Sequence, residues 1–115
     1  MKRLLEFLTL GMASRSGAEV TAYRRPLGYS QILNATLAAS TGIVFPTFPG
    51  GSLPGYAIIQ CQGGTVRWRD DGTAPTSTVG MSLATGEELD YSGDLTMIRF
   101  ISSAGTPILD ISLYE

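Results

Sequence analysis

Two runs of β-favouring residues flank a pair of adjacent glycines and form the clearest hydrophobic–polar pattern in the chain. Residues 56–62 and 65–69 are rich in β-branched and aromatic side chains, and Gly63-Gly64 separates them. A two-glycine spacer between such runs is typical of a tight β-hairpin, because glycine readily adopts the positive φ angles of the turn. The sequence therefore predicts a hairpin with the glycine pair as its turn.

The register of this hairpin sorts its side chains by polarity. Cys61 would face Val66, and Ile59 would face Trp68. Successive side chains of a strand point to opposite faces, so a slip of one residue would bury the arginines. The predicted inner face holds Ala57, Ile59, Cys61, Val66 and Trp68, and the predicted outer face holds Gln60, Gln62, Thr65, Arg67 and Arg69.

Further short β-favouring runs follow along the chain. Strands are predicted near residues 42–46, 87–91, 96–101 and 109–113, with residues 103–106 as a hairpin loop between the last two. Short strands about ten residues apart are typical of antiparallel sandwiches and jelly rolls. We therefore expect an all-β fold, an antiparallel β-sandwich or jelly roll, over residues 29–115.

Residues 1–28 are predicted to form an extended N-terminal arm that is mobile or bound to a partner. The arm begins with Lys2 and Arg3 and an apolar run, as a secretory signal does, but Glu6 interrupts the run. No segment of the chain is long and apolar enough to predict a membrane span. The predicted contact residues of the arm are Lys2, Arg3, Leu5, Phe7, Leu8, Arg24 and Arg25.

Composition narrows the possible chemistry. The 115 residues include no histidine, so a Ser-His-Asp triad and a histidine zinc site are both excluded. The single cysteine, Cys61, has no partner for an intrachain disulfide and is expected to be a small core residue. A chain of this length makes one domain.

The acidic residues come in adjacent pairs that do not suit catalysis. Asp70-Asp71 and Glu87-Glu88 are the two pairs, and neighbouring side chains in a strand point to opposite faces. A glycosidase needs two carboxylates that face one cleft, so neither pair predicts an active site. The aspartates are expected to cap turns, and their spacing matches no calcium loop. We predict no enzymatic activity, cofactor or metal.

Charge is distributed unevenly along the sequence. Residues 1–69 carry seven basic and two acidic side chains, whereas residues 70–115 carry one basic and eight acidic side chains. The two halves could meet across a contact between copies, or neutralise each other within one fold. Alternation places Trp68 on the face away from Arg67 and Arg69, which disfavours a nucleic-acid platform. The two arginines are instead predicted to contact a protein, or simply to be solvated.

Residues 55–114 resemble a family of small virion proteins of tailed bacteriophages. The resemblance is carried by GYAIIQ at residues 55–60, VRWRDDGTAPT at 66–76, VGM at 79–81, LDYSGDL at 89–95, IRFI at 98–101 and LDISLY at 109–114. Members are similar to capsid decoration, or cement, proteins, which have a β-sandwich or jelly-roll fold and lie outside the major capsid lattice. The resemblance implies no catalytic residues.

The resemblance implies a non-enzymatic decoration protein that binds the major capsid protein and stabilises the shell. We expect a homo-oligomer on the capsid exterior of the virion, made in the cytoplasm of a host bacterium, with no nucleic-acid or membrane partner. Its predicted contacts include Arg67 and Arg69 of the sheet, besides those of the arm. The alternatives are a carbohydrate-binding module with Trp68, Tyr56 or Tyr91 as an exposed platform, and a head–tail or tail component.

Overall fold

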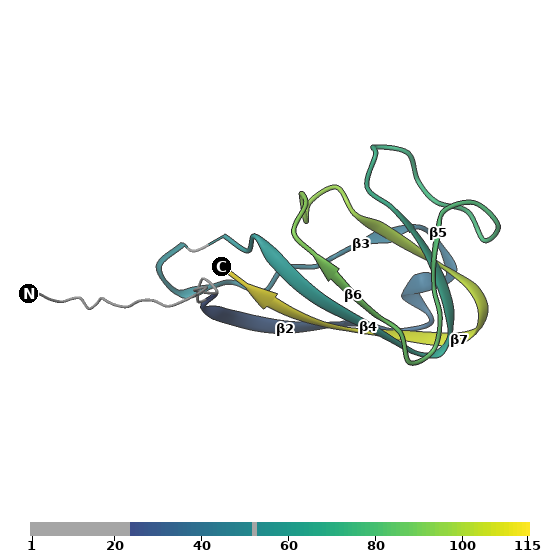
Figure 1. The fold of residues 1–115 in the computed structure, drawn as a ribbon, viewed down its shortest axis with the longest axis horizontal. Coiled ribbons are helices and arrows are strands. Elements are labelled where there is room, and N and C mark those ends of the chain that lie inside the picture. Colours follow the sequence, from purple (N-terminus) through teal and green to yellow (C-terminus); the bar gives the residue numbers. More distant parts are fainter. Residues whose placement is uncertain (1–23, 52) are drawn as a thin grey trace, which may run out of the picture.

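The structure, a computed structural model, describes residues 24–51 and 53–115. Within these residues the chain forms a six-stranded antiparallel sheet. Two long strands, β4 (Tyr56–Arg69) and β7 (Arg99–Tyr114), run side by side through the molecule and curve together (Figure 1). Their pairing extends from Tyr56 opposite Tyr114 to Arg69 opposite Arg99. The long strand pair therefore connects the remaining strands.

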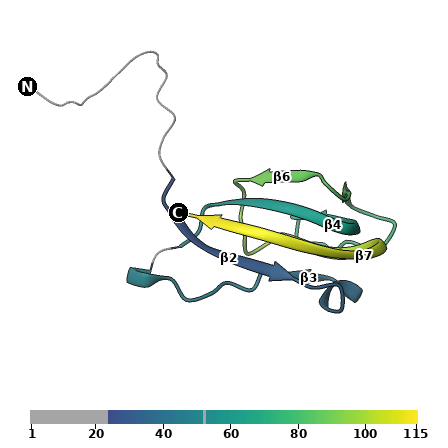
Figure 2. The ribbon, with the colours of Figure 1, turned by 90° about the horizontal axis from the view of Figure 1, so that it is seen from below.

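The long strand pair has a first half, which contains Tyr56 and Tyr114, and a second half, which contains Arg69 and Arg99. Two short strands flank each half. In the first half, β2 (Pro26–Ile32) pairs with β7, and β6 (Glu88–Tyr91) pairs with β4. In the second half, β3 (Thr41–Gly42) pairs with β7, and β5 (Met81–Leu83) pairs with β4. Figure 2 shows β6, β4, β7 and β2 in succession. Two short 3-10 turns, Thr36–Ala38 and Pro49–Gly51, lie in the connections.

Glycines occupy the position where the two halves join. Gly64 lies opposite Gly105, and the register shifts on both sides of this pair. Gly63 and Gly105 have φ angles of 79° and 69°, which glycine adopts without strain. A Cβ on Gly64 would lie 2.9 Å from the Pro107 ring, so the two backbones approach closely here. Bulges of this kind bend a strand and increase its twist.

The predicted hairpin is wrong. Residues 56–69 form one continuous strand, and Cys61 lies opposite Leu109 instead of Val66. The glycine pair supplies a bulge because a distant strand, β7, is available to pair with the whole of β4. The predicted loop at residues 103–106 is wrong for the same reason, since it lies inside β7. The strand predicted at 42–46 is limited to Thr41–Gly42.

The predicted inner face nevertheless matches the observed burial. Ala57, Ile59, Cys61 and Val66 are buried, and Trp68 is half-buried against the core. In a regular strand Cys61 and Val66 would point to opposite faces, because they are five residues apart. The bulge reverses the alternation between them, and a two-residue turn would have placed both on the same face as well. A hairpin and a continuous strand with a bulge therefore place the same side chains on the inner face.

The core joins the two halves of the sheet. Tyr91 from the first half packs edge to face against Trp68 from the second half, with ring centroids 6.1 Å apart. The Tyr91 hydroxyl also donates a hydrogen bond to Asp70 Oδ2 at 2.7 Å. The largest fully buried side chains are Phe100, Leu37, Ile59, Ile98, Leu109, Ile111, Leu113, Val66, Pro107 and Cys61. The all-β, antiparallel class and the strand expected near 87–91 are confirmed.

The predicted arm lies mostly outside the described residues. Strand β2 begins at Pro26, so the expected boundary between residues 28 and 29 falls inside this strand. The C-terminal end returns to the same place, because Pro26 lies opposite Tyr114 and the Glu115 N–H donates to the Arg25 carbonyl at 2.9 Å. The described part of the chain therefore begins and ends at one end of the long strand pair.

The close backbone approach at Gly64 predicts a large effect of a small substitution. Gly64→Ala forces a methyl group against the Ala104 carbonyl and the Pro107 ring, and should lower the free energy of unfolding by about 2 kcal/mol or more. Gly55→Ala is the matched control, because its Cβ would meet nothing closer than 3.9 Å. Urea unfolding of both variants measures the difference. Equal midpoints for the two would contradict a tight approach at Gly64.

Candidate interaction surfaces

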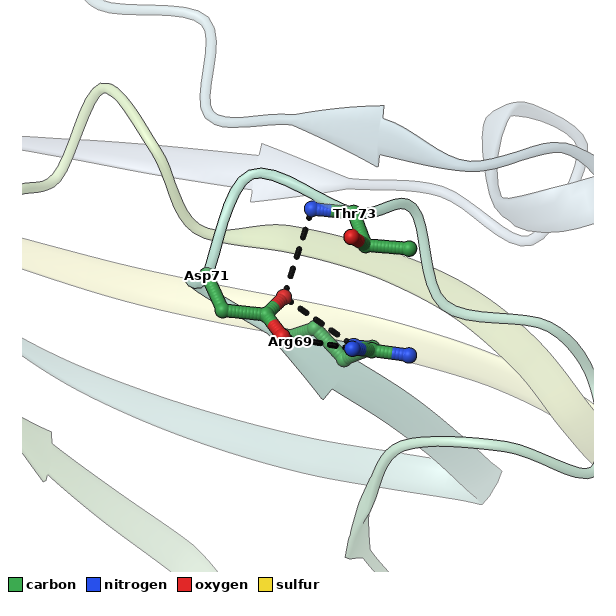
Figure 3. A network of polar contacts seen from close by, with 3 residues as sticks. All are labelled: Arg69, Asp71 and Thr73. Carbon is green, nitrogen blue, oxygen red and sulfur yellow. Dashed lines mark hydrogen bonds and ion pairs between the residues drawn. The ribbon is translucent and has the colours of Figure 1, made fainter.

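Arg69 is held in place by a carboxylate two residues further along the chain (Figure 3). Its Nε and Nη2 donate to Asp71 Oδ1 and Oδ2 at 3.0 and 2.5 Å. The Thr73 backbone N–H also donates to Asp71 Oδ1, at 3.3 Å. The hydrogen bond from Arg69, and then that from Thr73, lower the pKa of the Asp71 carboxyl. As expected, Asp71 caps a turn, and it also fixes the guanidinium.

Arg67 anchors the connection between β4 and β5. Its Nη1 donates to the Gly80 carbonyl at 3.0 Å, and its Nε is buried with no hydrogen-bond partner among the described residues. The Ser103 hydroxyl holds the same connection from β7, with a 2.9 Å hydrogen bond to the Ser77 carbonyl. The predicted contact residue Arg67 is therefore half-buried and bonded to its own chain.

A hollow of about 410 Å³ lies next to Trp68, at the edge of the sheet formed by β5. Val79 and Met81 are 51% and 60% exposed on its wall. Its lining residues are Trp68, Arg69, Asp70, Asp71, Val79, Gly80 and Met81. Neither Val79 nor Met81 was predicted to be a contact residue, because their exposure depends on β5 being the edge strand of the sheet. Their apolar type in a polar connection was the available signal.

Arg24 and Arg25 lie at the opposite end of the long strand pair. The Arg24 guanidinium carbon is 4.5 Å from the centroid of the Tyr56 ring, a cation–π contact. Arg25 Nε donates to Glu115 Oε1 at 2.8 Å. The sheet arginines thus lie at the other end of β4 from this pair, and the structure does not bring the two sets together. The predicted contacts Lys2, Arg3, Leu5, Phe7 and Leu8 lie outside the described residues.

A polar row crosses the outer face of the first half of the sheet. Gln31 lies opposite Asp110, Asp110 opposite Gln60, and Gln60 opposite Glu88. Residues in direct register share a face, so these side chains come from all four strands onto one surface. The hydrogen bond from the Tyr29 hydroxyl, followed by those from Gln31 and Gln62, lowers the pKa of Asp110.

An apolar cavity of about 500 Å³ lies between the connection after β3 and the turn after β6. Phe48 and Leu95 in its wall are buried, whereas Leu53 is 79% exposed. The other lining residues described are Phe45, Pro46, Thr47, Gly51, Pro54, Gly93, Asp94 and Thr96. Asp94 already accepts hydrogen bonds from the Thr96 backbone N–H at 2.9 Å and from its hydroxyl at 2.6 Å.

Residues 24–51 and 53–115 contain no group of three or more acidic or cysteine side chains placed to hold a metal ion. No helix in this part of the chain is long and apolar enough to span a membrane.

Comparisons with protein-family models, with curated proteins and with solved structures found no match to this chain.

The geometry of Arg69 and Asp71 predicts a specific titration result. Arg69→Gln should raise the pKa of Asp71 towards its ordinary value of 3.8, because the main donor to the carboxylate is lost. Asp94 is the control, since its lowered pKa comes from Thr96. Carboxyl carbon chemical shifts followed by NMR between pH 2 and 7 measure both values, an interval that covers the ordinary range of aspartate titration.

The sign of the stability effect follows from the same shift. The pKa of Asp71 is lower in the folded state than in the unfolded state, so its carboxylate stabilises the fold at pH values above the unfolded-state pKa. This contribution disappears as the pH falls through the folded-state pKa of Asp71. An Asp71 pKa that is unchanged by Arg69→Gln would show that the pair does not form in solution.

Proposed function

We propose that this chain is a non-enzymatic virion structural protein that binds the major capsid protein and stabilises the shell as a decoration protein. The resemblance of residues 55–114 to small phage virion proteins supplies the class of partner. The hollow beside Trp68 carries the proposal, because it offers a place where the side chain of another subunit can dock.

The side chains around this hollow are of the types that dominate protein interfaces. Tryptophan, methionine and arginine are enriched at such contacts, and a few well-packed residues carry most of the binding energy. Trp68 lines the hollow and is supported by Tyr91. Met81, which also lines it, is 60% exposed, and Asp71 fixes the guanidinium of Arg69. A side chain that is already fixed loses little entropy when a partner binds.

The bent sheet suits a protein that must transmit load between subunits. The pairing of β4 with β7 runs from Tyr56 opposite Tyr114 to Arg69 opposite Arg99, so backbone hydrogen bonds connect the two ends of the described fold. We propose that the two halves of the sheet act as the two layers of a β-sandwich, because their inner faces share one apolar core. A homo-oligomer, with the predicted arm residues as a second contact, completes the proposal.

The hollow predicts which substitutions abolish binding to the shell. The double variant Val79→Asp/Met81→Asp places two charges where a partner must remove water, and should weaken binding to heads that lack this protein by about tenfold or more. Val44→Asp is the control, because Val44 is 75% exposed and lines neither the hollow beside Trp68 nor the apolar cavity. Co-sedimentation of each variant with the heads measures binding.

Two outcomes would contradict different parts of the proposal. If wild-type protein leaves the heat and osmotic resistance of such heads unchanged, it does not stabilise the shell. If the double variant co-sediments as well as wild type does, the hollow is not the contact surface.

A further inference from the structure

The polar row on the outer face of the first half of the sheet is already ordered by its own hydrogen bonds. Tyr29 Oη and Gln31 Nε2 donate to Asp110 Oδ1 at 2.5 and 2.9 Å, and Gln62 Nε2 donates to Asp110 Oδ2. Gln60 Nε2 donates to Glu88 Oε1 at 3.2 Å. Long exposed side chains normally lose rotamer freedom when they bind, so this prior ordering lowers the cost of binding.

The three glutamine amides keep binding capacity after these bonds are made. A primary amide has two N–H donors and a carbonyl oxygen with two lone pairs. Each glutamine uses one donor in the network, and no hydrogen bond among the described residues uses its carbonyl oxygen. The row therefore presents donors and acceptors together, as a ligand rich in hydroxyl groups requires.

Tyr29 adds an aromatic surface next to the row. It precedes Gln31 by two residues on the same face of β2, and it is 60% exposed. The hydrogen bond from its hydroxyl to Asp110, on the neighbouring strand, holds the ring across the sheet. An aromatic ring with a bonded hydroxyl offers an apolar face to a ligand without leaving a polar group unpaired.

A hollow of about 250 Å³ borders the row on the side of β6. Its lining residues are Gln60, Cys61, Gln62, Thr85, Gly86 and Asp110. The turn that forms its wall is fixed to β4, because the Gly86 N–H donates to the Cys61 carbonyl at 2.8 Å and the Thr85 hydroxyl to the Gly64 carbonyl at 2.8 Å. This hollow turns an otherwise open sheet face into a bounded site.

The charge of the face selects the class of ligand. Glu88, Asp90 and Asp110 lie on it, so it repels anions. A basic peptide is a weaker fit, because Asp110 already accepts three hydrogen bonds and Glu88 accepts one. A neutral sugar suits the remaining groups, since its hydroxyls can donate to amide oxygens and accept from amide N–H groups.

We propose that the face formed by Tyr29, Gln31, Gln60, Gln62 and Asp110 binds a neutral oligosaccharide. This site differs from the aromatic platform of the alternative carbohydrate-binding module that the sequence left open. Tyr91 is 7% exposed and Trp68 is half-buried, and the Arg24 guanidinium lies over the Tyr56 ring. The site also lies on a different half of the sheet from the proposed shell contact, so the two proposals stand independently.

Binding of a panel of neutral hexasaccharides to the full chain tests this proposal. The probes are maltohexaose, cellohexaose, laminarihexaose, mannohexaose and chitohexaose, each added to about 10 mM, where even a millimolar site is mostly filled. Amide chemical shifts in NMR spectra report binding. At least one probe should shift the signals of β2, β4 and β7 around the row.

Substitutions then locate the site. Tyr29→Ala and Gln62→Ala should each weaken binding of that probe by about tenfold, because a stacking surface or a positioned amide is lost. Val44→Ala is the control, since Val44 is 75% exposed and lines neither this hollow nor the hollow beside Trp68. Unfolding midpoints measured in parallel identify any variant that fails to fold, and the other variant then decides the result.

Three outcomes would overturn the proposal. The first is that no hexasaccharide in the panel shifts any signal. The second is that a hexasaccharide binds but both folded variants bind it as well as wild type does. The third is that hexalysine, used as a basic-peptide probe, shifts the signals of the row while every hexasaccharide leaves them unchanged.

Discussion

The antiparallel pairing of β4 with β7 is the contact on which the rest of the structure depends. Every other strand pairs with one of these two. The pairing stays continuous through a sharp change of register because Gly64 meets Gly105 without side chains between them. The glycines thus determine where the register between the two long strands changes.

This arrangement assigns different chemistry to different surfaces. Trp68 from one half of the sheet packs against Tyr91 from the other half, and an apolar hollow lies next to Trp68 at the edge formed by β5. The outer face of the first half carries amides, carboxylates and Tyr29. An apolar edge suits contact with another protein subunit, whereas an ordered polar face suits a ligand rich in hydroxyl groups. One bent sheet can therefore support both proposals.

Local patterns in the sequence predicted the class of fold and the inner face, but not the strand pairing. The alternation of apolar and polar residues around Ile59 and Val66 can be seen in the sequence itself, so the burial of these two side chains could be predicted from it directly. Pairing depends on which distant segment supplies hydrogen bonds, and Gly63-Gly64 fits a turn or a bulge equally well. The proposed oligosaccharide site was harder to predict, because the polar row from Gln31 to Glu88 exists only once four strands are in register.

Part of the uneven charge of the sequence is balanced inside the described fold. Arg25 pairs with Glu115 and Arg69 pairs with Asp71, while Arg67 donates to a backbone carbonyl. Exposed ion pairs contribute little stability individually, but they also occupy the groups that a charged partner would need. A contact based mainly on Arg67 and Arg69 would have to break the pair between Arg69 and Asp71 and the hydrogen bond from Arg67 to the Gly80 carbonyl. The apolar side chains of Val79 and Met81 have no such competing bonds, so association at this edge depends on removing their surface from water.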